Sequence, residues 1–293
     1  MFALKVLIKS LIDYAGLFPP AQLGMSQAVE NFAGYAKGSH RGELGRFVVS
    51  AARLGEFETN FAHLPQESKS GWRISLLLGP NIESDIALAE EFNKDHADRC
   101  LIDSIEAKAL NSREVLALDS TVPSSMELWI EISSRPETAE LLASIKSVGR
   151  MAKIRTGGVT PEAIPPAGDV ARFLYLCHAA GVACKATAGL HHPLTGNFSL
   201  TYETGSARAT MFGFLNVFLA ATLIHGGGAE ADAAALLADG DSANFSCTAD
   251  ALVWRNQRFA AAQLAASRRD LCRSFGSCSF TEPIEGLVEL KWL

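Results

Sequence analysis

Two lysines at matching places in neighbouring apolar runs are the residues whose chemistry most needs an explanation. Lys153 lies two residues before Arg155 in one run, and Lys185 lies two residues before Thr187 in the next. Lysine is rare in such runs because burying an unpaired charge is costly. A lysine amine attacks a carbonyl only when neutral, and desolvation or a nearby cation lowers its pKa from about 10.4. The pattern predicts amine catalysis, with Lys153 as nucleophile and Lys185 and Arg155 as neighbouring cations.

Carboxylates in similar apolar surroundings supply groups for proton transfer. Asp103 and Glu131 each interrupt an otherwise apolar run, and Asp103 is the candidate for moving protons to and from a substrate. Asp13, near the start of the chain, fits a catalytic role and a turn cap equally well. The alternative to catalysis is a buried layer of ion pairs, in which the lysines and carboxylates only hold a core together.

A pair of histidines, His191 and His192, follows the run that contains Lys185. Adjacent side chains at the end of a strand point in different directions, so we expect at most one of them to face a pocket. That histidine could act as an acid, a base or a metal ligand. The chain has neither H-x-H nor H-E-x-x-H, and no G-x-G-x-x-G opens a helix after the first strand. We therefore expect no metal and no other cofactor.

The elements that position these residues alternate along the chain. Helical runs such as Gly168–Ala180 and Ala207–His225 lie between short runs of strand type. In the first of these helices Val170, Phe173, Leu174 and Cys177 form one apolar stripe, as expected for a helix that covers a sheet. The eight expected strands are Leu11–Leu17, Arg46–Ala52, Trp72–Leu78, Cys100–Ile105, Glu127–Ile132, Met151–Arg155, Ala183–Thr187 and Asn244–Val253.

Eight such units in 293 residues predict a closed (β/α)8 barrel, formed as a single domain by residues 1–293. In this fold every second side chain of a strand points inward, and those near the C-terminal ends line the active site. The polar segment His192–Ser206 after the seventh strand is an insertion that we expect to act as a lid. Ala229–Ala238 adds a helix, and Ser274–Leu293 is a C-terminal extension with no evident place in the barrel.

The amino-acid composition limits the kinds of partner that this protein is expected to bind. The net charge is −6 and no basic stripe is present, which argues against nucleic acid or an anionic membrane as a partner. The longest apolar stretch, Ala209–Ile224, falls short of the roughly 20 residues of a membrane span. A buried helix, or one covered by a second copy in a homo-oligomer, fits it better. Six cysteines without a C-x-x-C pair predict reduced thiols in a cytoplasmic protein.

Three segments carry a resemblance to a known family. Leu11–Pro20 resembles the opening strand of the deoxyribose-phosphate aldolases, which are class I (Schiff-base) aldolases. Lys153–Glu162 resembles their sixth strand and the loop after the Schiff-base lysine, and Cys184–Gly189 resembles their seventh strand. Asp103 falls near the place of their proton-relay aspartate. The resemblance implies that Lys153 forms the Schiff base, that Lys185 depresses its pKa, and that Asp103 moves the proton.

The expected eighth strand departs from that family. Its last strand ends in a small-residue loop that holds phosphate, whereas Asn244–Trp254 contains no glycine. Whether the substrate is phosphorylated therefore stays open. We predict an aldolase-like lyase that acts on a small carbonyl or sugar-like molecule through Lys153, Lys185 and Asp103. The side chains that we assign to substrate binding are Arg155, Glu131, Thr187, His191, His192 and Asp13.

Two alternatives remain. One is a barrel isomerase or lyase without a Schiff base, in which Lys153, Arg155 and Lys185 bind an anionic substrate. Asp103, Glu131 or His191 would then transfer the proton. The other is a non-catalytic binding protein that keeps the charges for stability. Fold alone does not separate the three, because this barrel hosts many chemistries. An open pocket next to Lys153 favours catalysis, and a densely packed ion-pair layer favours a structural role.

Overall fold

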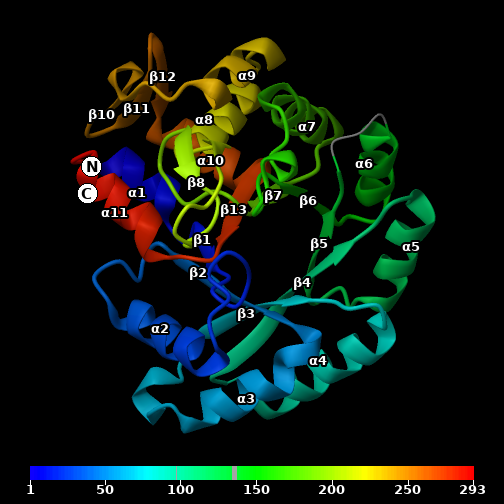
Figure 1. Ribbon diagram of the computed structural model, residues 1–293. Coiled ribbons are helices and arrows are strands. Elements are labelled where there is room, and N and C mark those ends of the chain that lie inside the picture. Colours follow the sequence, from blue (N-terminus) through cyan, green and yellow to red (C-terminus); the bar gives the residue numbers. More distant parts are fainter. Residues whose placement is uncertain (97, 134–136) are drawn as a thin grey trace.

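Eight parallel strands close into a barrel in the computed structural model, which describes residues 1–96, 98–133 and 137–293 (Figure 1). Around the barrel the strands follow the order β1-β13-β7-β6-β5-β4-β3-β2. This confirms the predicted (β/α)8 fold. The bounds of the barrel strands are β1 Ile12–Tyr14, β2 Leu44–Ser50, β3 Trp72–Leu77, β4 Cys100–Lys108, β5 Glu127–Glu131, β6 Met151–Arg155, β7 Cys184–Thr187 and β13 Cys272–Ser277.

Helices surround the strands, as Figure 1 shows. They bury the apolar stripes that the sequence predicts: Val170, Phe173, Leu174 and Cys177 of α7 are all inaccessible to solvent. The helices are α1 Phe2–Ile8, α2 Met25–Lys37, α3 Leu54–His63, α4 Ile82–His96, α5 Ser112–Thr121, α6 Thr138–Ser147, α7 Ala167–Ala180, α8 Phe214–His225, α9 Glu230–Ala238, α10 Ala261–Asp270 and α11 Thr281–Glu289.

The strand that closes the barrel is not the predicted one. β13 pairs with β7 on one side and with β1 on the other. Asn244–Val253 instead contributes β10 (Phe245–Cys247) and β11 (Ala251–Trp254), which with β12 (Gln257–Ala260) form a separate antiparallel sheet. The prediction failed because β13 reads Cys-Arg-Ser-Phe-Gly-Ser, a sequence with few of the apolar residues by which strands are recognised. β13 contains one glycine, Gly276, whereas the predicted strand Asn244–Val253 contains none.

The region after β7 also differs in part. Strands β8 (Gly196–Ser199) and β9 (Arg208–Met211) form an antiparallel hairpin, so the helix expected from Ala207 begins only at Phe214. Every residue of α8 from Phe214 to Ile224 is buried within this one chain, against α7, α9 and α10 among others. This confirms a buried helix, and the homo-oligomer stays a prediction. Among the helices of the described residues, none is long and apolar enough to cross a membrane.

Replacing Phe275 tests whether β13 is the closing strand. The Phe275 side chain is fully buried, and its ring stacks on Phe214 of α8 at 5.4 Å between centroids. Phe275→Ala should lower the free energy of unfolding by about 3–5 kcal/mol, because it opens a cavity between the barrel and a helix. Arg258→Ala, an exposed change on β12, should leave that free energy almost unchanged. Urea denaturation measures both, and equal effects would contradict the assignment.

Candidate active site

Charged side chains form a continuous series across the barrel interior. Lys185 Nζ lies 2.6 Å from Asp13 Oδ2 and 2.7 Å from Glu106 Oε1. The other oxygen of Glu106 accepts a hydrogen bond from Lys153 Nζ at 2.7 Å, and Lys153 Nζ also lies 2.8 Å from Glu131 Oε2. The order in space is therefore Asp13, Lys185, Glu106, Lys153, Glu131, with a lysine between each two carboxylates.

Strand register brings these groups together. Lys153 is the register partner of Lys185 on one side and of Glu131 on the other, so the three side chains start at one level. β13 lies between the strands of Lys185 and Asp13. Its Ser274 is small, and its hydroxyl donates a hydrogen bond to Asp13 Oδ2 at 2.9 Å. A larger side chain there would separate the amine from the carboxylate.

Both lysines are buried, with Lys153 4% exposed, but only Lys153 borders a cavity. Lys185 is 1% exposed, and its amine lies 5.7 Å from the centre of the Trp129 ring. Burial lowers the pKa of Lys185, but Asp13 and Glu106 outweigh burial and raise it above the ordinary value. Burial likewise acts to raise the pKa of Glu106, yet the two lysines hold it well below its usual range. Asp13 and Glu106 thus favour the charged form of Lys185, and Glu106 lies between this amine and Lys153.

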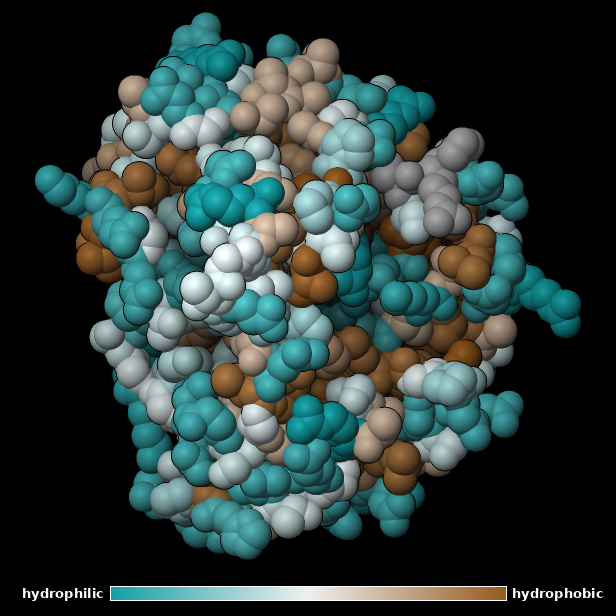
Figure 2. Space-filling model, in the orientation of Figure 1, coloured by the Kyte–Doolittle hydropathy of each residue, from teal (hydrophilic) through white to brown (hydrophobic). Residues whose placement is uncertain are grey.

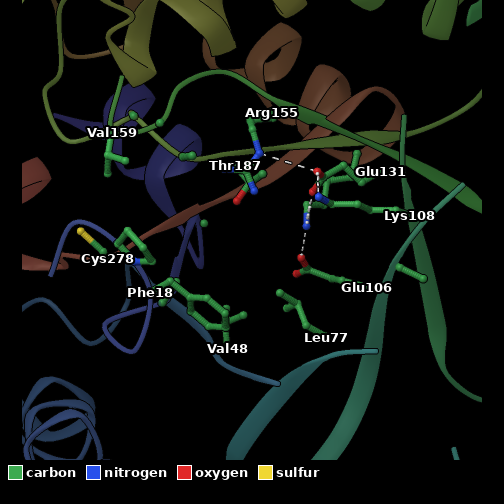
Figure 3. Close-up of a pocket in the computed structure, with 18 of the residues that line it drawn as sticks. Phe18, Val48, Leu77, Glu106, Lys108, Glu131, Arg155, Val159, Thr187 and Cys278 are labelled. Atoms are coloured by element: carbon green, nitrogen blue, oxygen red, sulfur yellow. Dashed lines mark hydrogen bonds and ion pairs between the residues drawn. The ribbon is translucent and has the colours of Figure 1, made fainter. Parts of the chain in front are cut away.

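A cavity of about 520 Å³ opens at the C-terminal ends of the strands and reaches Lys153. Glu106 and Glu131 also line it, whereas Asp13 and Lys185 do not. Figure 3 shows Arg155 and Lys108 beside Glu131, on one side of this space. Their side chains are 49% and 71% exposed. On the face seen in Figure 2, apolar side chains show between polar ones around the centre.

Close contact of two loops shapes one wall of the cavity. Gly189 follows β7 with a φ of +78°, a conformation that side chains other than glycine rarely adopt. A Cβ on Gly157, in the loop after β6, would lie 2.8 Å from the Cα of Gly189. Thr156 donates a hydrogen bond from its hydroxyl to the carbonyl of Ala188 at 2.8 Å. The loops that follow the two lysine strands are therefore fixed against each other.

Asp103 does not belong to this site, although the sequence and the resemblance both placed it there. The strand β4 has a bulge at this point: Ile74 pairs with Ile102, but Ser75 pairs with Ser104. Asp103 instead accepts hydrogen bonds from Arg46 at 2.7 Å and Arg73 at 2.6 Å, groups near the N-terminal ends of their strands. The bulge shifts the alternation, so Glu106 occupies the inward position.

Of the two histidines, His191 lines the cavity and His192 does not, as expected for adjacent residues. The ring of His192 stacks on the ring of Phe198 of β8, with 3.5 Å between the ring centroids. Burial and then the neighbouring His191 lower its pKa. Thr187 and Arg155 line the cavity as predicted, whereas Asp13 lies beneath it as a partner of Lys185.

His191 belongs to a further polar cluster in the cavity wall. Its Nδ1 donates a hydrogen bond to Glu282 Oε2 at 2.9 Å, and Tyr202 donates one to the same oxygen at 3.1 Å. Cys278 Sγ lies 3.9 Å from each ring nitrogen of His191. Burial lowers the pKa of His191, but the hydrogen bonds with Cys278 and Glu282 outweigh burial and raise it to about 9. The ring is therefore an imidazolium at neutral pH.

Sequence reasoning missed two residues that line the cavity, Glu106 and Cys278, and two that lie beside it, Tyr202 and Glu282. The predicted fourth strand ended at Ile105, so the alternation of Ser104, Glu106 and Lys108 was not followed to its end. That alternation is the signal that identifies Glu106. Cys278 and Glu282 lie in the segment to which no place was assigned, and Tyr202 lies in the hairpin loop. No sequence pattern pointed to these three.

Comparisons with known proteins give no further guide to this site. No protein-family model matches the chain, and no curated protein matches it. The resemblance of its short motifs to the deoxyribose-phosphate aldolases therefore stays a prediction. In the part of the chain that the structure describes, no three histidine, cysteine or acidic side chains are arranged to hold a metal ion.

Two matched variants separate the roles of the lysines. Lys185→Met should lower the free energy of unfolding by about 3–5 kcal/mol, because it leaves Asp13 and Glu106 buried without their shared cation. Lys153→Met should cost less, since Glu131 faces a cavity from which water can solvate it. Chemical denaturation of both proteins gives the two values. A larger loss for Lys153→Met would contradict the division into a structural and an accessible lysine.

The pKa of His191 predicts a loss of stability in alkali. A pKa raised from 6.5 to about 9 contributes stability that is complete below about pH 6.5 and disappears as the pH rises through 9. The contribution is about 3 kcal/mol. Wild-type protein should lose stability over this window, and His191→Gln should lose less of it. Equal slopes for the two proteins would show that His191 is not the titrating group.

Proposed function

We propose that this barrel is an enzyme, an aldolase-like lyase that acts on a small carbonyl compound by forming an imine with Lys153. The observation that carries the proposal is the contrast between the lysines. Lys153 borders a cavity of about 520 Å³ at the C-terminal ends of the strands, whereas Lys185 is enclosed. Active sites of this fold lie at that end of the barrel. A purely structural ion-pair layer gives no reason for open space beside one of its amines.

Imine formation needs a group that takes a proton from Lys153. Glu131 Oε2 is 2.8 Å from Nζ and borders the cavity, so we assign this role to Glu131. Burial raises the pKa of Glu131, but Lys153 outweighs burial and, with Arg155 and Lys108, lowers it, so the carboxylate is ionised before substrate binds. Glu106 is a poorer acceptor because Lys185 shares it. The neutral amine then adds to the carbonyl carbon as the C=O π bond breaks, and the oxygen leaves as water with the two protons of the amine nitrogen, which gives a neutral imine.

Two cationic side chains at the rim of the cavity favour an anionic substrate. Arg155 Nε and Lys108 Nζ lie 3.7 and 3.5 Å from Glu131 Oε1, distances at which neither forms a close hydrogen bond with it. Both side chains are exposed and can turn toward a carboxylate or phosphate on the substrate. We therefore propose a small carbonyl compound that carries a negative charge.

A second candidate is a barrel isomerase or lyase without a Schiff base. It is favoured by the hydrogen bonds of Lys153 with two carboxylates, at 2.7 and 2.8 Å, which suit a fixed cation as well as a nucleophile. In that enzyme Lys153 and Arg155 bind the anionic group, and Glu131 transfers the proton.

Borohydride trapping distinguishes the two. Incubation with a panel of small aldehydes and keto acids, followed by reduction and intact mass measurement, should give a stable adduct at Lys153. Peptide mapping should find none at Lys185, and Lys153→Met should prevent the adduct. Circular dichroism checks that this variant is folded. Binding of a keto acid without any reducible adduct would favour the second candidate.

A further inference from the structure

A thiol and an imidazole line the cavity on the side away from Glu131, and a carboxylate contacts the imidazole. Cys278, directly after β13, borders the cavity and is 6% exposed, and Figure 3 shows it across the space from Glu131 and Lys108. Its sulfur lies 3.9 Å from both nitrogens of His191, which is held by Glu282 at 2.9 Å. This cluster lies apart from the residues that surround Lys153 and has no role in the chemistry of that amine.

The order of the three groups gives the thiol a cationic neighbour. Glu282 accepts a hydrogen bond from the Nδ1–H of His191 and so favours the positively charged ring. A pKa of about 9 for the imidazole is in agreement with this contact. An imidazolium next to a thiol stabilises its thiolate, which is the nucleophilic form. Tyr202, from the hairpin loop, places its hydroxyl 3.8 Å from the same sulfur and 3.1 Å from Glu282.

The other cysteines have different surroundings. Cys100, Cys177, Cys184 and Cys272 are buried. Burial raises the pKa of Cys100, and contact with a neighbouring cysteine, together with burial, raises the pKa of Cys184 and Cys272. Cys247, on β10, is partly exposed, and burial raises its pKa as well. Within the described residues, contact with a histidine and a place on the cavity wall coincide only at Cys278. A packing role alone does not account for that combination.

We propose that Cys278, His191 and Glu282 form a second nucleophilic site of the cavity, which adds its thiolate reversibly to a small aldehyde. The S–C bond forms as the π bond of the carbonyl breaks, and the oxygen takes the proton that His191 holds. The product is a neutral hemithioacetal, and no oxidant or reductant takes part. This site goes beyond the proposed function, because it does not use the Lys153 amine.

Alkylation of the folded protein with iodoacetamide at pH 7 measures the reactivity of the thiol. Cys278 should be alkylated about tenfold faster than the more exposed Cys247, because its sulfur lies beside the positively charged ring of His191. Peptide mass mapping reads both rates from one sample of the wild-type protein. His191→Gln and the milder Glu282→Gln should slow Cys278 and leave Cys247 unchanged.

A separate NMR experiment detects the aldehyde adduct. Propanal labelled with ¹³C at its carbonyl carbon should give a resonance of a carbon bonded to both sulfur and oxygen, and Cys278→Ser should remove it. An equal or lower alkylation rate for Cys278 than for Cys247, or the lack of this resonance in wild-type protein, overturns the proposal. Neither readout involves borohydride or Lys153, so failure here and failure of imine trapping are distinct results.

Discussion

The carboxylate of Glu106 is the group on which the interior of this barrel depends. Each of its oxygens binds one lysine at 2.7 Å. The hydroxyl of Ser75 donates a further hydrogen bond to Glu106 Oε1 at 2.8 Å. A charge so deeply buried is tolerated only when it is fully paired. Because Lys153 and Lys185 start from the same level on neighbouring strands, one carboxylate between them offsets the repulsion that would otherwise separate the strands.

The same carboxylate makes the two lysines unequal. Lys185 is enclosed by Glu106 on one side and by Asp13 on the other, and Asp13 is itself fixed by the backbone amide of Arg46 at 2.9 Å. Lys153 has Glu131 as its second partner, and this carboxylate borders the cavity. Exchange of a proton or a partner is therefore possible only at the Lys153 end. A series of five charges thus has one rigid end and one end open to a ligand.

Strand alternation was sufficient to place Lys153 with Arg155, and Lys185 with Thr187, on shared faces of their strands. A charge in an apolar run pointed to Glu131, which lines the cavity, but the same signal pointed to Asp103, which lies outside it because a bulge in β4 shifts the alternation. Sequence reasoning failed again at β13, whose inward positions are Ser274 and Gly276. Small residues there are what allow Lys185 to reach Asp13, so the feature that hid the strand is the one that the ion pairs require.

Reductive methylation of the folded protein with ¹³C-formaldehyde and cyanoborohydride tests the inequality of the lysines most directly. Formaldehyde is small enough to enter the cavity, and peptide mapping shows which lysines have been methylated. The account predicts that Lys153 is methylated in the native protein and that Lys185 is methylated only after denaturation. Methylation of Lys185 in the native protein, or protection of both lysines, would contradict it.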